Sequence, residues 1–92
     1  MKHRRTPRFV KAFASLPPEI KEQARKAFLL FQENPSHSSL SIERIEGYPG
    51  LWSGRITKKY RWTFHFEEDS QTGERICVHR TIGAHDEIYR KP

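Results

Sequence analysis

The second half of the chain holds four side chains whose chemistry suits the binding and cleavage of a phosphodiester. Arg55 and Arg61 lie on neighbouring predicted strands, where two guanidinium groups could hold one phosphate or two adjacent ones. His85 can exchange a proton near neutral pH, and Tyr89 can stack on an unpaired base. RNA carries its own nucleophile, the 2′-hydroxyl, so cleavage needs a base, cations that stabilise the phosphorane and an acid for the leaving 5′-oxygen. The pattern favours cleavage of RNA without a metal ion.

Further polar side chains are expected to contact RNA around these four. They are Lys58 and Lys59 at the turn between the strands, His65 on the same face as Arg61, Asp86 beside His85, and Arg90 near the C-terminal end. A plain structural explanation exists for most of them. Arginines on a strand are commonly part of a solvated face, and His65 is better explained as a half-buried structural imidazole. His85 is the stronger histidine candidate because it lies in a polar segment.

The histidines and the cysteine argue against a metal centre. The five histidines form no HExxH pattern and no Cys/His pairing along the sequence. Cys77 is the only cysteine, so the chain can form no internal disulfide, and a reducing, cytoplasmic setting fits best. The sequence therefore predicts neither a metal ion nor another cofactor.

Charge and length narrow the class of protein. The chain has 17 Lys and Arg residues against 11 Asp and Glu residues, a net charge of +6, which favours a polyanionic partner such as nucleic acid over a merely basic surface. No apolar run approaches the length of a membrane span, and the N-terminus lacks the apolar core of a secretory signal. The length predicts a single domain over residues 1–92. Residues 1–8 are expected to form a flexible basic arm, either frayed or in contact with phosphates.

Hydrophobic periodicity predicts helices followed by an antiparallel meander. Residues 19–34 carry one apolar stripe at helical spacing, and Asn34-Pro35 ends that helix. Residues 51–56, 60–67 and 75–83 alternate with the period of a strand, the last with Ile76, Val78 and Ile82 on one face. Helices before strands predict an α+β fold with the N-terminal helices packed on one face of the sheet. The other face would then be free and lined with cationic and imidazole side chains.

The order of these segments resembles the RelE/ParE toxin superfamily over residues 8–90. The segments are LPPEIKEQARKAFLLFQENP, then LWSGRITKKYRWTF, then RTIGAHDEIY. Three features carry the resemblance: a helix that opens at Leu16-Pro17, Tyr60-Arg61 near the start of a strand, and Ile82-Gly83 followed by Tyr89. The resemblance implies a small fold of helices on a curved antiparallel sheet.

The resemblance also implies a function and roles for residues. It implies the toxin of a type II toxin–antitoxin system, with a cognate antitoxin as partner. RelE-like members cut mRNA on the ribosome by attack of the 2′-hydroxyl, without a metal. Carried over, Arg61 holds the scissile phosphate, Arg55 is a basic residue of the preceding strand, His85 is the general acid, and Tyr89 stacks on the base.

One departure from the pattern keeps other functions open. Ser53 stands where RelE itself has a lysine, which leaves the general base unassigned, with His65 and His37 as candidates. ParE-like members share the fold and inhibit DNA gyrase, so a gyrase inhibitor is the first alternative. A non-toxic homologue that binds nucleic acid or a protein partner through its basic face is the second. Arg61, His85 and Tyr89 together favour the nuclease.

Overall fold

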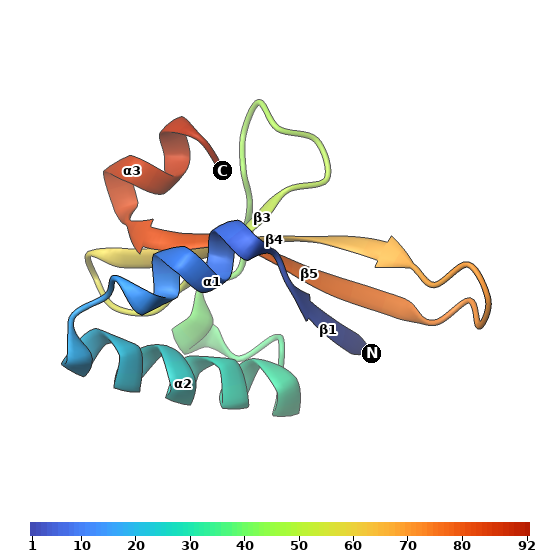
Figure 1. Cartoon of the computed structure of the whole chain (residues 1–92), viewed down its shortest axis with the longest axis horizontal. Helices are drawn as coiled ribbons and strands as arrows, with labels where there is room; N and C mark the ends of the chain where they lie inside the picture. The colour runs from blue at the N-terminus through green and yellow to red at the C-terminus, as the bar shows by residue number, and fades with distance from the viewer.

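A computed structural model describes all 92 residues, with one sheet that has helices on both of its sides (Figure 1). Its elements, in chain order, are β1 (Lys2–Arg5), α1 (Pro7–Ala14), α2 (Pro18–Glu33), the 3-10 helix η1 (Ser38–Leu40), β2 (Glu43–Arg44), β3 (Trp52–Arg55), β4 (Tyr60–Glu68), β5 (Arg75–Ala84) and α3 (His85–Arg90). The view shows α2 below the sheet and α3 above it. None of the helices has the length and apolarity to cross a membrane.

The helix predicted over residues 19–34 is confirmed, with its start one residue earlier. Helix α2 begins at Pro18, where the missing N–H of proline has no helical partner to lose. It ends before Asn34, whose N–H still donates to the Leu30 carbonyl oxygen. Its apolar stripe packs against the sheet through Ala24 and Phe31, which are both buried.

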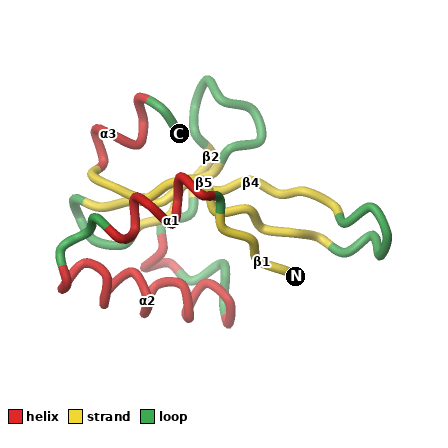
Figure 2. The backbone as a smooth tube through the Cα atoms, in the orientation of Figure 1, coloured by secondary structure: helices red, strands yellow, loops and turns green.

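The sheet is mixed, which corrects the expectation of a purely antiparallel one. The strand order is β1-β5-β4-β3-β2, and β1 pairs with β5 in parallel while all other pairs are antiparallel (Figure 2). Residues 2–5, expected in a flexible arm, form β1. This strand has no alternation of apolar and polar residues from which it could be predicted. It is held by its parallel pairing with β5 and by ion pairs from Lys2 to Asp69 and from Arg4 to Glu67.

A cluster of aromatic rings fills the space between the sheet and helices α1 and α2. Trp62 is 0% exposed and packs edge-on against Phe28 and Phe31, with ring centroids 5.3 and 5.5 Å away. The indole reaches across to β3, where Gly54 leaves room for it, since a Cβ atom at Gly54 would lie 2.2 Å from two carbons of the ring. This close approach fixes how β3 sits beside β4.

A β-bulge in β5 changes which residues face the helices. Thr63 pairs with Thr81 and Phe64 pairs with His79, so that Arg80 is the extra residue. The predicted face of Ile76, Val78 and Ile82 is therefore wrong. Ile82 packs in the core with Trp62, whereas Val78 pairs with His65 on the opposite face. Cys77 and His79, which precede the bulge in the chain, face the helices.

Candidate active site

The face opposite α1 and α2 carries the side chains that the sequence predicted for the site. Along β4 the side chains alternate, so Arg61 and Thr63 face away from the core that holds Trp62 and Phe64. Helix α3 covers part of this face. A Cβ atom on Gly83, the partner of Arg61 on β5, would meet Glu87 and Ile88 of α3 at 3.5 Å.

Arg61 lies at the centre of this face, between Arg55 of β3 and Gly83 of β5. Its side chain is half-buried, and its Nε atom is buried without a hydrogen-bond partner. None of the ion pairs of the structure includes Arg61 or Arg55. A buried donor without an acceptor costs about 1–3 kcal/mol, and an anion bound at Arg61 would supply the missing acceptor.

Arg55 and Arg61 are direct cross-strand partners. The neighbouring pair is hydrogen-bonded, since the Ile56 N–H donates to the Tyr60 oxygen at 3.0 Å, so Arg55 and Arg61 form the closer, non-hydrogen-bonded type of pair. Like charges in such a pair repel. The Arg55 side chain is exposed and lines a hollow of about 250 Å³ between α2, η1 and the end of β3, together with Lys26 and Ser39. The cross-strand pair therefore places two cations side by side, neither of which forms an ion pair with a carboxylate.

Helix α3 begins directly beside the turn between β3 and β4. The His85 N–H donates to the Lys59 carbonyl oxygen at 2.7 Å, which holds the first residue of α3 at that turn. The His85 imidazole is about half exposed, with its Nδ1 atom 3.6 Å from the Asp86 carboxylate. Its ring lies edge-on to the Tyr89 ring, with centroids 4.6 Å apart. His85 is thus placed by its neighbours and open to solvent.

Ser53 has a role that the sequence did not predict. It is 1% exposed, and its Oγ atom accepts a hydrogen bond from the Tyr89 hydroxyl at 2.8 Å. This bond fixes α3 to β3 across the face of the sheet. Ser53 thus orients Tyr89, and Tyr89 in turn contacts His85.

His65 is bound on both sides by charged groups. Its Nδ1 atom accepts a hydrogen bond from Arg80 at 2.8 Å, so its Nε2 atom carries the hydrogen and donates to Glu67 at 2.8 Å. The hydrogen bonds from His65 and from Arg4 lower the pKa of Glu67. His65 also lies four residues along β4 from Arg61, or about 13 Å. The structure places it in a network that ties neighbouring strands together.

The remaining predicted residues lie in exposed positions around the site. His37 is exposed and caps η1, where its Nδ1 atom accepts a hydrogen bond from the Ser39 N–H. The side chains of four of them are exposed, namely Lys58, Lys59, Asp86 and Arg90. Lys58 and Lys59 belong to the turn whose backbone binds His85, so the fold brings them close to His85 although they are distant in the sequence.

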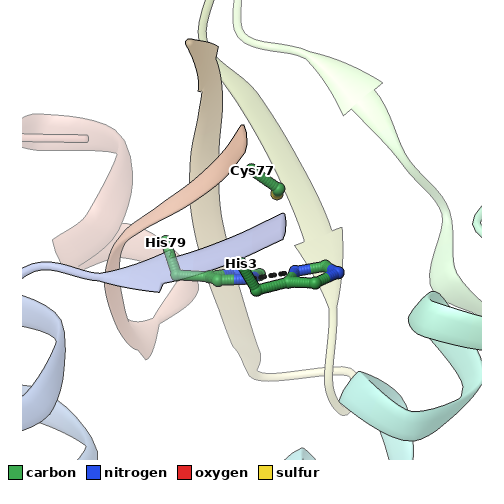
Figure 3. A group of neighbouring side chains, drawn as sticks. All are labelled: His3, Cys77 and His79. Atoms are coloured by element: carbon green, nitrogen blue, oxygen red, sulfur yellow. Dashed lines mark hydrogen bonds between the residues drawn. The ribbon is translucent and has the colours of Figure 1, made fainter. Parts of the chain in front are cut away.

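The structure also brings together three residues that the sequence analysis did not connect, namely His3, Cys77 and His79 (Figure 3). One ligand atom from each lies within 4.8 Å of the other two. Burial raises the pKa of the Cys77 thiol to about 12 and lowers the pKa of His79 to about 4. The spacing of Cys77 and His79 on one strand could have revealed this pair, but the contact with His3 depends on the parallel pairing of β1.

Comparisons with known proteins find likeness in structure and not in sequence. No family model matches the chain, and no curated protein sequence matches it. A YoeB/ParE toxin from Agrobacterium tumefaciens superposes with a TM-score of 0.71 at 17% identity, over 92% of this chain and 99% of that one. The RelB-RelE antitoxin-toxin complex from Methanococcus jannaschii gives 0.68 at 21% identity, over 97% and 99%. YafQ from E. coli strain BL21(DE3) gives 0.73 at 9%, over 95% and 96%.

These matches, together with the helix-on-sheet arrangement, define the class of fold. The chain has the fold of the RelE/ParE toxins, and the resemblance seen in the sequence is confirmed at that level. The match extends over nearly the whole length of both partners, so the site described above lies within the shared fold.

Proposed function

We propose that this protein is the toxin of a type II toxin–antitoxin system and acts as an endoribonuclease on mRNA at the ribosome. The observation that carries the proposal is Arg61, half-buried at the centre of a cationic face that α3 covers only in part, with a buried Nε atom that has no acceptor. A phosphodiester oxygen is an acceptor of the right charge for this group. The toxins that share the fold support the role of a toxin.

Four side chains have roles in the cleavage reaction, namely those of Arg55, Arg61, His85 and Tyr89. Arg61, with Arg55 beside it, binds the scissile phosphate and stabilises the charge that develops when the 2′-oxygen attacks phosphorus. The 2′-hydroxyl loses its proton to solvent water, the bond from phosphorus to the 5′-oxygen breaks, and His85 gives its proton to that leaving oxygen and regains one from solvent afterwards. The products are a 2′,3′-cyclic phosphate and a free 5′-hydroxyl. Tyr89 holds the His85 ring through the edge-on contact and offers its own ring to the neighbouring base.

A cognate antitoxin is the expected protein partner. Solved relatives of this fold include antitoxin–toxin complexes. The net charge of +6 and the free cations around Arg61 fit an acidic, partly disordered chain that covers this face. The toxin would then act in the cytoplasm, where ribosomes and mRNA are found, when the antitoxin is lost.

The test is controlled expression in a bacterial host, with pulse-labelled protein synthesis and mapping of mRNA ends. We expect a rapid fall in translation and cuts inside codons that leave cyclic phosphate ends. Arg61→Ala and His85→Ala should each lower the cleavage rate by about 10²–10⁴-fold, the usual effect of losing a phosphate ligand or a general acid. Purified variants should keep the wild-type circular dichroism spectrum.

A matched control removes an arginine that lies elsewhere. Arg25 is exposed on α2, where it forms an ion pair with Glu22 of the same helix at 3.6 Å and lies over the Phe13 ring, and Arg25→Ala should leave toxicity unchanged. Full toxicity of both Arg61→Ala and His85→Ala would refute the proposal. Filamentation with normal translation would identify a gyrase inhibitor instead, and unharmed growth would identify a non-toxic binding protein.

A further inference from the structure

Three metal-binding side chains converge on the helix side of the sheet, away from Arg61. His3 on β1 pairs in register with Cys77 on β5, and His79 follows two residues later on the same face of β5. The Nδ1 atom of His3 lies 3.0 Å from the Nε2 atom of His79, and the two rings are stacked (Figure 3). One ligand atom from each of the three lies within 4.8 Å of the others.

The surroundings of His79 leave it without a full set of partners. His79 is 7% exposed, and its Nδ1 atom is buried with no hydrogen-bond partner. Aromatic rings of Phe9, Phe28 and Phe31 surround it at centroid distances of 5.7 to 6.3 Å. A cavity of about 70 Å³ adjoins both histidines and has room for one or two water molecules. The cavity is lined by both imidazoles together with Arg5 and Gln32, while Cys77 is fully buried beside them and does not line it.

We propose that His3, Cys77 and His79 bind a thiophilic transition-metal ion, with Zn²⁺ as the natural occupant. Nitrogen and sulfur ligands in this combination suit Zn²⁺, and the cavity supplies a place for water as the fourth ligand. Two histidine nitrogens on one tetrahedral Zn²⁺ lie about 3.3 Å apart and a sulfur and a nitrogen about 3.6 Å apart. The histidine nitrogens already stand at 3.0 Å, and the Cys77 sulfur, within 4.8 Å of both, would have to approach them by up to about 1 Å.

The ion would join β1 to β5 and serve the fold. Strand β1 has four residues, none apolar, and apart from its backbone pairing with β5 it is held by exposed ion pairs, which contribute little stability. A bond from His3 through the ion to two residues of β5 would fix it. On binding, Cys77 loses its thiol proton to solvent and each imidazole binds through a nitrogen that carries no hydrogen. This site does not depend on the nuclease activity proposed above.

The experiment uses the full chain, freed of metal by a chelator, with Co²⁺ as a spectroscopic substitute for Zn²⁺. We expect one Co²⁺ per chain, a sulfur-to-cobalt charge-transfer band and the intense visible bands of four-coordinate Co²⁺, all lost on addition of Zn²⁺. Cys77→Ser should remove the charge-transfer band. It should weaken Zn²⁺ binding by at least about 100-fold, more than changes outside the ligand set usually do.

His3→Gln keeps the test decisive where Cys77→Ser fails to fold, because His3 is half-buried on an edge strand. This variant should weaken Zn²⁺ binding by at least about tenfold and abolish the rise of the unfolding midpoint that Zn²⁺ causes in the wild-type chain. His37→Asn is the matched control, since asparagine can cap η1 as His37 does, and its Zn²⁺ affinity should not change. Weak Co²⁺ binding without a sulfur band, or binding that His3→Gln leaves intact, would overturn the proposal.

Discussion

A single methyl group added at Gly54 should destabilise the protein strongly. The Cβ atom of Gly54→Ala would lie 2.2 Å from two ring carbons of Trp62, more than about 1 Å inside carbon–carbon contact distance. Trp62 cannot retreat, because it is fully buried against Phe28 and Phe31. Overpacking of a well-filled core costs about 1–3 kcal/mol. With a conflict of this size against a rigid ring, we expect a loss of about 3 kcal/mol in the free energy of unfolding.

Urea denaturation followed by tryptophan fluorescence and circular dichroism measures this loss. Gly83→Ala is the control, since a Cβ atom there meets Glu87 and Ile88 at an ordinary 3.5 Å and should change stability by less than about 1 kcal/mol. In the background of Trp62→Phe, which lacks the far half of the indole, Gly54→Ala should cost much less, with a coupling energy of about 1–3 kcal/mol. Equal costs in both backgrounds would show that the ring is not the cause.

Three further predictions concern hydrogen bonds. Tyr89→Phe removes the donor to the buried Ser53 oxygen and should lower the free energy of unfolding by about 1 kcal/mol in urea denaturation, while cleavage falls less than in His85→Ala. Thr6→Ala removes the N-cap of α1 and should cost about 1–2 kcal/mol, whereas Thr6→Ser keeps most of it. The Asp69 carboxylate accepts hydrogen bonds from two N–H groups of its own turn, which lowers its pKa from 3.8 to about 2. Its contribution to stability is therefore present above pH 4 and is lost as the pH falls through 2. An NMR titration of its carboxyl carbon measures this pKa, which would be ordinary if those bonds were absent.

The parts of the fold that depend on local pattern could be predicted from the sequence. The stripe of α2 and the alternation of β4 reflect burial on one side, and both elements appear within one residue of the predicted bounds. Strand β1 could not be predicted, because KHRR has no apolar residue and its partner, β5, lies some 70 positions away. Its stability comes from a neighbour that the local sequence does not contain.

The candidate site divides in the same way. Strand parity was enough to place Arg55 and Arg61 side by side, since a short turn joins their two strands. Parity could not show that the Tyr89 hydroxyl reaches Ser53, because that contact depends on how α3 folds back over the sheet. Nor could it show that His65 is held by Arg80, which faces His65 only because of the bulge.

The bulge at Arg80 decides which side chains of β5 face the helices and which face the side of the sheet that carries Arg61. A regular β5 would put His79 on the same face as Thr81, since side chains two apart share a face. The extra residue instead turns Arg80 and Thr81 toward the face of Arg61 and sends Cys77 and His79 toward the helices. The bulged backbone is held by Thr6, whose hydroxyl donates to the Arg80 carbonyl oxygen at 2.8 Å. Deletion of Arg80, the extra residue, should therefore leave a regular strand in which Thr63 still pairs with Thr81 and Phe64 with His79, so that Cys77 and His79 keep their place toward the helices and circular dichroism shows an intact fold.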